Sequence, residues 1–85
     1  MKVLDIVSTP NPNAVKVLLD STLEPGMRSY FNAAAAKDDA LAAALFDVPG
    51  VSGVMVLGTF ITISKSKEAQ WSGIIGPVRQ ILERT

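Results

Sequence analysis

The sequence contains no cysteine and no histidine among its 85 residues. This excludes disulfide bonds, thiolate nucleophiles, and zinc or iron–sulfur ligation by thiolate or imidazole groups. It also removes the side chain best suited to proton transfer near neutral pH, so a Ser-His-Asp triad cannot form. Only oxygen ligands remain for a metal. We therefore expect no cofactor, no metal site and no enzymatic activity.

Net charge and long apolar segments are missing as well. Eight Lys and Arg residues balance eight Asp and Glu residues, so no long-range field attracts nucleic acid or an anionic membrane. Residues 48–64 carry no charge, but they include Pro49 and three glycines, and a membrane-spanning helix needs about 20 apolar residues. Asp5 interrupts the N-terminal apolar run, so no signal-peptide core forms. We expect a cytoplasmic protein without a membrane segment.

The residues that are present predict a single domain over residues 1–85, with two hairpins and two helices. Alternating apolar residues indicate strands at residues 2–8 and 14–20, and β-branched runs on either side of Gly58 indicate two more. Apolar residues repeat at helical spacing from Asp39 to Val48, where Pro49 and Gly50 end the run. A second helical stripe, beginning near Ser66 as a possible N-cap, contains Trp71, Ile74, Ile75, Val78, Ile81 and Leu82. Within it, Gly73 and Pro77 predict a kink or a break.

The order strand-strand-helix-strand-strand-helix predicts an α+β fold. Helices with a single apolar stripe must cover the same sheet face, which gives a two-layer sandwich on a mostly antiparallel four-stranded sheet. The other face is expected to be partly solvated and to carry Lys16, Phe60 and Thr62. The sequence does not determine the conformation of residues 21–37. Pro25-Gly26 fits a type II turn, and Asn32 is a possible helix cap. Tyr30-Phe31 either extends along the sheet edge or covers the core.

The turn between the first two strands is unusual, because it reads Thr9-Pro10-Asn11-Pro12-Asn13. Each proline restricts the residue before it, so the turn is stiffer than a hairpin requires. Outward-facing polar side chains and free carbonyls on a rigid turn are typical of a preorganised recognition loop. The segment is either a simple turn or a partner-binding loop.

Four other groups of residues have a functional and a structural interpretation. Asp38 and Asp39 point in different directions and suit helix capping better than a cation site. Trp71 heads the apolar stripe, which favours core packing. Lys16, Lys65 and Phe60 could bind single-stranded nucleic acid, and an unrecognised hydrolase would need Ser64 or Lys65. We favour the structural interpretation in each case.

Several blocks of the sequence resemble, in order and spacing, the N-terminal domain of Nfu/NifU-type iron–sulfur scaffold proteins. They are Thr9-Pro10-Asn11-Pro12-Asn13-Ala14 with Lys16, Leu45-Phe46 with Val48-Pro49-Gly50-Val51, and Phe60-Ile61-Thr62-Ile63-Ser64-Lys65 with Trp71. In that family the cluster is held by a Cys-x-x-Cys motif of a separate C-terminal domain, which has no counterpart in these residues.

The resemblance implies an accessory, protein-interaction domain in iron–sulfur cluster assembly or delivery that does not itself carry a cluster. Its expected partners are client apoproteins or a cluster-binding Nfu domain. We expect neither nucleic acid nor a membrane as a partner. The predicted partner-binding residues are Thr9, Pro10, Asn11, Pro12, Asn13 and Lys16.

Overall fold

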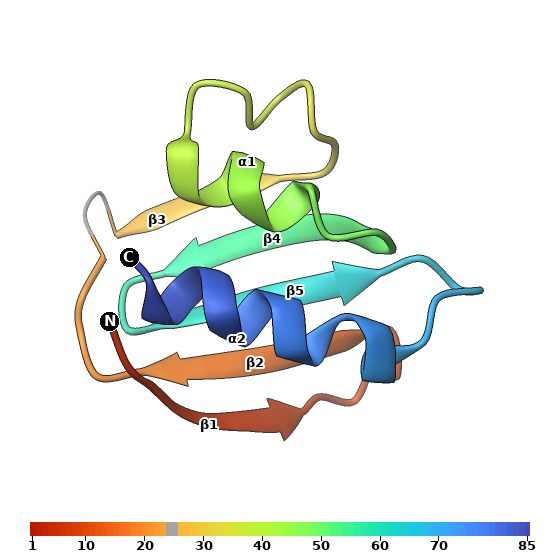
Figure 1. Cartoon of the computed structure of the whole chain (residues 1–85), viewed down its shortest axis with the longest axis horizontal. Coiled ribbons are helices and arrows are strands. Elements are labelled where there is room, and N and C mark those ends of the chain that lie inside the picture. The colour runs from red at the N-terminus through yellow and green to blue at the C-terminus, as the bar shows by residue number, and fades with distance from the viewer. Residues whose placement is uncertain (24–25) are drawn as a thin grey trace.

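A computed structural model describes residues 1–23 and 26–85 of the chain and shows a sheet covered by helices on one face (Figure 1). The proposed turn at Pro25-Gly26 therefore lies partly outside the described residues. The elements, in chain order, are β1 (Val3–Ser8), β2 (Ala14–Leu19), β3 (Met27–Tyr30), α1 (Ala40–Phe46), β4 (Val51–Leu57), β5 (Phe60–Lys65), the 3₁₀ helix η1 (Trp71–Gly73) and α2 (Ile75–Glu83).

The sheet has five antiparallel strands in the order β1-β2-β5-β4-β3, so the prediction of four strands was wrong. The additional strand is β3, which lies at the edge and pairs with β4 from Met27 opposite Leu57 to Tyr30 opposite Val54. Tyr30 thus follows the extended alternative left open by the sequence. The predicted α+β class, and the placement of both helices on one face, are confirmed (Figure 1).

Both predicted hairpins form, and their alternation separates a buried sheet face from an open one. Val15, Val17 and Leu19 of β2 are buried, whereas Lys16 between them is exposed. β2 pairs with β5 through Val17 opposite Ile61 and Lys16 opposite Thr62. Because successive side chains of a strand point to opposite faces, Lys16 and Thr62 lie on the face away from the helices, as predicted.

Of the two capping candidates, Asp38 and Asp39, it is Asp39 that caps α1. Its carboxylate accepts a hydrogen bond from the Ala42 N–H at 3.2 Å.

The second helix differs from the prediction at its start. Residues 66–70 are not helical, and α2 begins at Ile75, after η1 has ended at Gly73. Pro77 therefore lies in the first turn of α2, where a missing backbone N–H costs no helical hydrogen bond.

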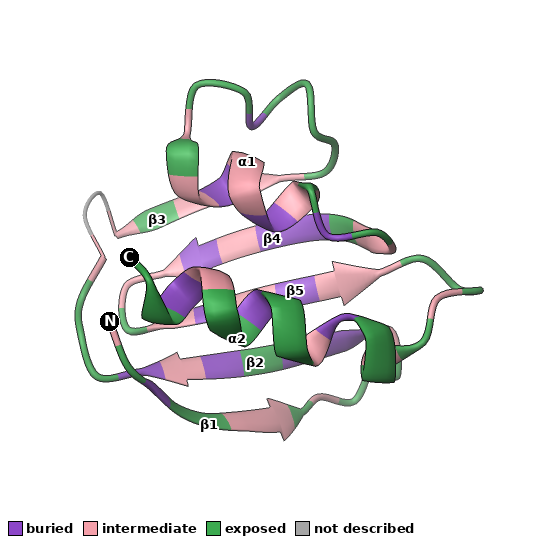
Figure 2. Ribbon diagram, in the orientation of Figure 1, coloured by how far each residue is buried: buried purple, intermediate pink, exposed green. Residues whose placement is uncertain are grey.

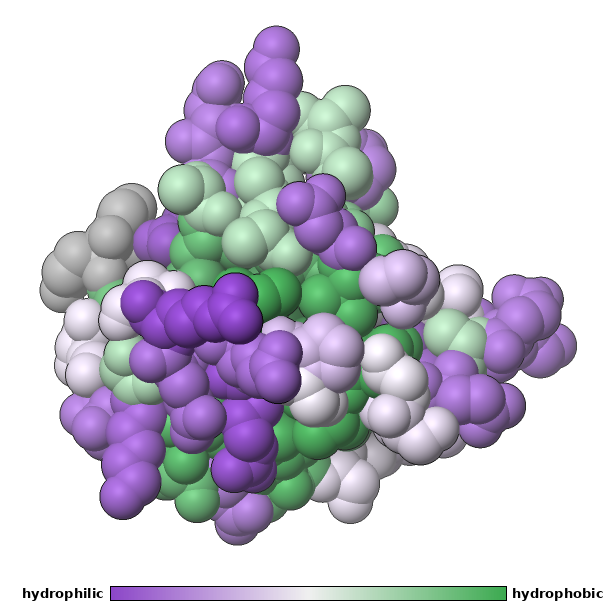
Figure 3. All heavy atoms as spheres, viewed as in Figure 1, coloured by the Kyte–Doolittle hydropathy of each residue, from purple (hydrophilic) through white to green (hydrophobic). Residues whose placement is uncertain are grey.

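The core lies between the sheet and the helices (Figure 2). Its most fully buried large side chains come from β2, β4, β5, α1, Ile74 and α2, and they are Leu45, Ile61, Ile63, Ile74, Leu82, Val17, Val54, Val56 and Val78. On the helix side, hydrophilic residues gather over α2 while hydrophobic ones show in the seam toward α1 (Figure 3). Within the described part of the chain, no helix is long and apolar enough to cross a membrane.

Candidate partner-binding loop

The loop Thr9–Asn13 is closed by hydrogen bonds between its own residues. The Thr9 hydroxyl accepts from the Asn11 backbone N–H at 3.1 Å and can donate to the carbonyl oxygen of Asn11 at 2.9 Å or of Ala14 at 3.1 Å. The Asn11 side-chain oxygen accepts from the Asn13 N–H at 2.9 Å, and the Ala14 N–H donates to the Asn11 carbonyl at 3.1 Å. These side-chain bonds are those of Asx and Ser/Thr turns, so the loop holds one shape.

Two residues from the other end of the sequence fasten this loop to the rest of the domain. The Lys65 ammonium at the end of β5 donates to the Asn13 side-chain oxygen at 3.0 Å, and its backbone N–H donates to the Asn13 carbonyl at 2.8 Å. The Trp71 indole N–H, in η1, donates to the Pro12 carbonyl at 3.0 Å. The Lys65 nitrogen also lies 5.8 Å from the centre of the Trp71 ring, within cation–π range.

This arrangement changes two sequence interpretations. Trp71 is half-buried and packs against the core, as predicted, but its polar edge also holds the loop. The backbone carbonyls of Asn11, Pro12 and Asn13 accept hydrogen bonds within the domain, so the expectation of free carbonyls was wrong for these three. No local pattern in the sequence predicts the Trp71 contact, because its partner lies 59 residues away.

The exposed part of the loop consists of Pro10, Asn11 and Pro12, while Thr9 and Asn13 are half-buried. Lys16, the sixth predicted partner-binding residue, is exposed on the open sheet face. Its ammonium lies 4.7 Å from the centre of the Phe60 ring, and Phe60 is level with Leu18, farther along β2 from the loop. Lys65 rather than Lys16 is therefore the lysine in contact with the loop.

The residues of the nucleic-acid alternative lie on two faces of the sheet. Phe60 and Lys16 belong to the open face, whereas Lys65, five positions after Phe60 in the same strand, projects toward the helix side and contacts Trp71. The same alternation of side chains puts Ser64 and Lys65 on opposite faces of the sheet, so a serine–lysine pair is not brought together.

In the described residues no group of three or more Asp and Glu residues could hold a metal ion.

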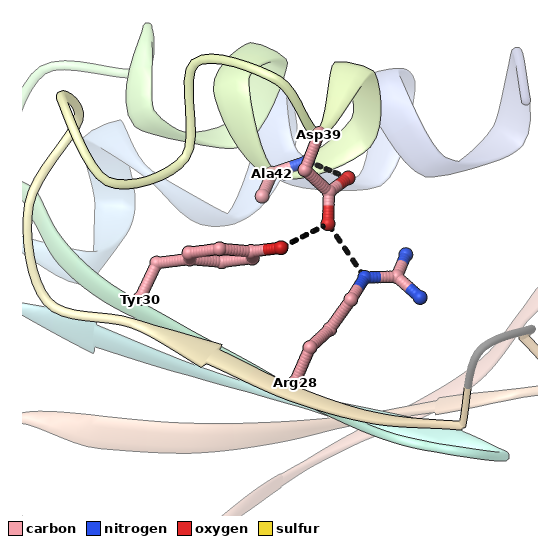
Figure 4. Close-up of polar contacts among 4 residues, drawn as sticks. All are labelled: Arg28, Tyr30, Asp39 and Ala42. Carbon is pink, nitrogen blue, oxygen red and sulfur yellow. Dashed lines mark hydrogen bonds and ion pairs between the residues drawn. The ribbon is translucent and has the colours of Figure 1, made fainter.

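A polar cluster that sequence reasoning missed joins the edge strand to the first helix (Figure 4). The Asp39 carboxylate accepts from the Arg28 Nε–H at 2.5 Å and from the Tyr30 hydroxyl at 2.9 Å, in addition to capping α1. Burial alone would raise the pKa of Asp39, but the Ala42 N–H, Tyr30 and Arg28 together lower it. The hydrogen bond to Asp39 in turn raises the pKa of Tyr30. This cluster is structural: it fastens β3 under α1.

Comparison with known families gives a match over almost the whole chain. The family model described as "Scaffold protein Nfu/NifU N terminal" matches residues 4–85. The "NFU1 iron-sulfur cluster scaffold homolog, mitochondrial" of Drosophila erecta is 39% identical over 66 residues, which is 75% of this chain and 23% of that protein. The Bacillus subtilis protein YpgR is 30% identical over 80 residues, which is 93% of this chain and 21% of that protein. The chain thus spans less than a quarter of the length of these relatives.

Solved structures share the fold over nearly all of this chain. The crystal structure of protein SAV1430 from Staphylococcus aureus matches with a TM-score of 0.83 and 25% identity, covering 96% of this chain and 99% of that one. The solution structure of a NifU-like protein from Saccharomyces cerevisiae matches with a TM-score of 0.78 and 26% identity, covering 99% of this chain and 79% of that one. The relatives include mitochondrial and bacterial proteins, so the cytoplasmic location stays a prediction.

Proposed function

The chain belongs to the Nfu/NifU N-terminal family, which is associated with iron–sulfur cluster biogenesis, and we propose that it is a protein-interaction domain in this process. In this role it is not an enzyme. It contacts client apoproteins or a cluster-binding Nfu domain through the loop Thr9–Asn13, with Lys16 on the adjoining strand. The observation that carries the proposal is the rigid, exposed loop, held by its own side chains and by Lys65 and Trp71.

The residues of this chain do not fit a cluster of their own. Iron–sulfur clusters are held mainly by cysteine thiolates, in some cases with histidine, and the 85 residues contain neither. The domain is therefore proposed to bring proteins together, while the ligands for the cluster come from the partner.

A rigid loop supports this role because a preorganised surface loses less conformational entropy when it binds. Pro10 and Pro12 restrict Thr9 and Asn11, and the hydrogen bonds around them leave the two proline rings and the Asn11 side chain exposed. A loop that served only to connect β1 and β2 would need neither proline nor the contacts from Lys65 and Trp71.

The proposal is tested by the double variant Pro10→Ala/Pro12→Ala. Each replacement removes the φ restriction of a proline from the loop, so preorganisation is lost and we expect the affinity for a Cys-x-x-Cys Nfu domain or an apo client to fall about fivefold, with a native circular dichroism spectrum. Pro49→Ala is the matched control, since Pro49 is also exposed but lies between α1 and β4. Equal affinity of the double variant and the wild-type protein would contradict the role of the loop.

A further inference from the structure

The hydrogen bonds of the loop determine how its two asparagine amides are oriented. The oxygen of Asn11 accepts the Asn13 backbone N–H at 2.9 Å, and the oxygen of Asn13 accepts the Lys65 ammonium at 3.0 Å. Both of these neighbours can only donate, so an amide nitrogen cannot take the place of either oxygen. The two NH₂ groups must therefore point away from these contacts.

Neither NH₂ group has a hydrogen-bond acceptor within the described residues. Asn11 is exposed. Asn13 is half-buried, but no buried side-chain nitrogen or oxygen in the described part of the chain lacks a partner, so the Asn13 nitrogen is open to solvent. The loop thus presents both N–H groups of each amide to its surroundings.

The oxygens that could balance these donors are mostly occupied. The backbone carbonyls of Asn11, Pro12 and Asn13 accept the bonds described above, and the Thr9 hydroxyl oxygen accepts the Asn11 N–H. No carboxylate lies within Thr9–Asn13 or among the described residues that hydrogen-bond to it, whereas the Lys65 ammonium donates to Asn13. Three of the five backbone carbonyls of the loop are thus engaged, and the charged group that hydrogen-bonds to the loop is positive.

We propose that this loop binds an acidic, extended peptide segment of its partner, an inference that rests on the proposed function and names the chemistry of the partner. Carboxylate oxygens accept hydrogen bonds only, and bonds to a charged acceptor are the stronger kind. They meet the Asn11 and Asn13 amides beside Lys65, while the exposed rings of Pro10 and Pro12 offer apolar contact to the peptide backbone.

A nucleic-acid strand is a poorer match for the same surface. Phosphate-backbone binding depends on several cations acting together, and this loop contacts one ammonium, while that of Lys16 lies over Phe60 on the open face. The formal net charge of the chain is zero, so no wider field compensates.

Nuclear magnetic resonance of the ¹⁵N-labelled protein tests the proposal through the side-chain NH₂ signals of Asn11, Asn13 and Asn32. The probes are terminally blocked hexapeptides of alternating glutamate and glycine, the same peptide with glutamine for glutamate, and a short single-stranded oligonucleotide. We expect the glutamate peptide to shift the Asn11 and Asn13 signals and to leave Asn32 unchanged, with no comparable effect from the other two probes. Equal shifts from the glutamine peptide, or tighter binding of the oligonucleotide, would overturn the proposal.

The variant Asn13→Asp separates partner recognition from loop structure. The aspartate still accepts the Lys65 ammonium, but it replaces the outward donor with a negatively charged acceptor, and like charges across an interface oppose binding. We expect about tenfold weaker binding of the glutamate peptide. Asn32→Asp is the control, because the Asn32 oxygen also accepts a hydrogen bond within the domain, from the Ala35 backbone N–H at 2.7 Å, but in a different loop. Equal affinities of the two variants would contradict the proposal.

These results are distinguishable from a failure of the proposed function. If an Nfu domain or an apo client binds the loop and Asn13→Asp binds it as tightly as the wild type, the acidic segment is wrong and the interaction role stands. If the glutamate peptide binds and neither protein does, the recognition chemistry holds and the iron–sulfur role fails.

Discussion

The indole N–H of Trp71 donates to the carbonyl oxygen of Pro12 at 3.0 Å, so a residue of η1 holds a turn that lies 59 positions earlier in the sequence. The start of the helical layer and the loop between the first two strands are thereby joined. Lys65 adds a second connection through Asn13. The proposed binding loop is consequently part of the folded domain, and its shape depends on residues outside the loop.

Replacing Trp71 by Phe removes the N–H donor and keeps most of the aromatic packing. We expect the free energy of unfolding to fall by about 1 kcal/mol, the usual net contribution of one hydrogen bond. The Ala14 amide, which closes the loop onto Asn11, should exchange with solvent faster, while the amides of β5 keep their protection. Unchanged exchange at Ala14 would show that the Trp71 contact does not hold the loop.

Asp39 should make the stability of the fold depend on pH. Its pKa is lowered in the folded state: burial raises it, but the Ala42 N–H, Tyr30 and Arg28 lower it by more. A lowered folded pKa gives stability that is present above the unfolded pKa, about 3.9, and is lost as the pH falls through the folded value. We therefore expect the unfolding free energy to decrease as the pH falls from about 5.

The variant Asp39→Asn tests this contribution. It keeps an oxygen for the α1 cap but loses the charge that Arg28 and Tyr30 contact, so we expect a loss of about 2 kcal/mol at pH 7 and a flatter acid limb in pH-dependent urea unfolding. The pKa of Asp20 is also lowered, so the unfolding free energy of this variant should still depend on pH to a smaller extent. Asp38→Asn, an exposed neighbour, is the control, and an acid limb as steep in Asp39→Asn as in this control would contradict the assignment.

Gly50 and Gly58 both have positive φ, 98° and 81°, but they differ in their surroundings. A Cβ at Gly50 would lie 2.7 Å from the Ala69 Cβ, whereas among the described residues the nearest atom to a Cβ at Gly58 would be the Gly26 carbonyl oxygen at 4.0 Å. Left-handed backbone costs an L-residue about 1–2 kcal/mol, and crowding in a packed site adds about 1–3 kcal/mol. Chemical denaturation should therefore show that Gly50→Ala is destabilised more than Gly58→Ala, and the reverse order would contradict the packing described.

Local signals predicted most of the fold. The alternation of Val15, Val17 and Leu19 and the cap at Asp39 act through neighbouring residues, and the structure confirms both. The predicted stop at Pro49-Gly50 was too late, because α1 ends at Phe46. The apolar stripe from Trp71 to Leu82 also lies on the core side. Its assumed start at Ser66 failed because residues 66–70 contribute no buried apolar stripe, while Trp71–Gly73 forms only a 3₁₀ turn before α2.

The features that sequence reasoning missed depend on distant partners. Strand β3 is four residues long and contains Arg28 and Ser29, so its apolar pattern is weak. It is held by pairing with β4 and by the contacts of Arg28 and Tyr30 with Asp39. For the candidate site, the sequence predicted the rigid loop but not its fastening by Lys65 and Trp71, because hydrogen bonds across 52 and 59 residues leave no local pattern.

The partner-binding role of the loop is tested most directly by an amide NMR titration of the ¹⁵N-labelled protein with a Cys-x-x-Cys cluster-binding Nfu domain and, separately, with an apo client protein. We expect chemical-shift changes that cluster at Asn11, Asn13 and Lys16, with the amides of β3 and of residues 31–38 unaffected. A flat response to both proteins, or changes confined to β3 and α1, would contradict the claim that this loop binds partners in iron–sulfur cluster assembly.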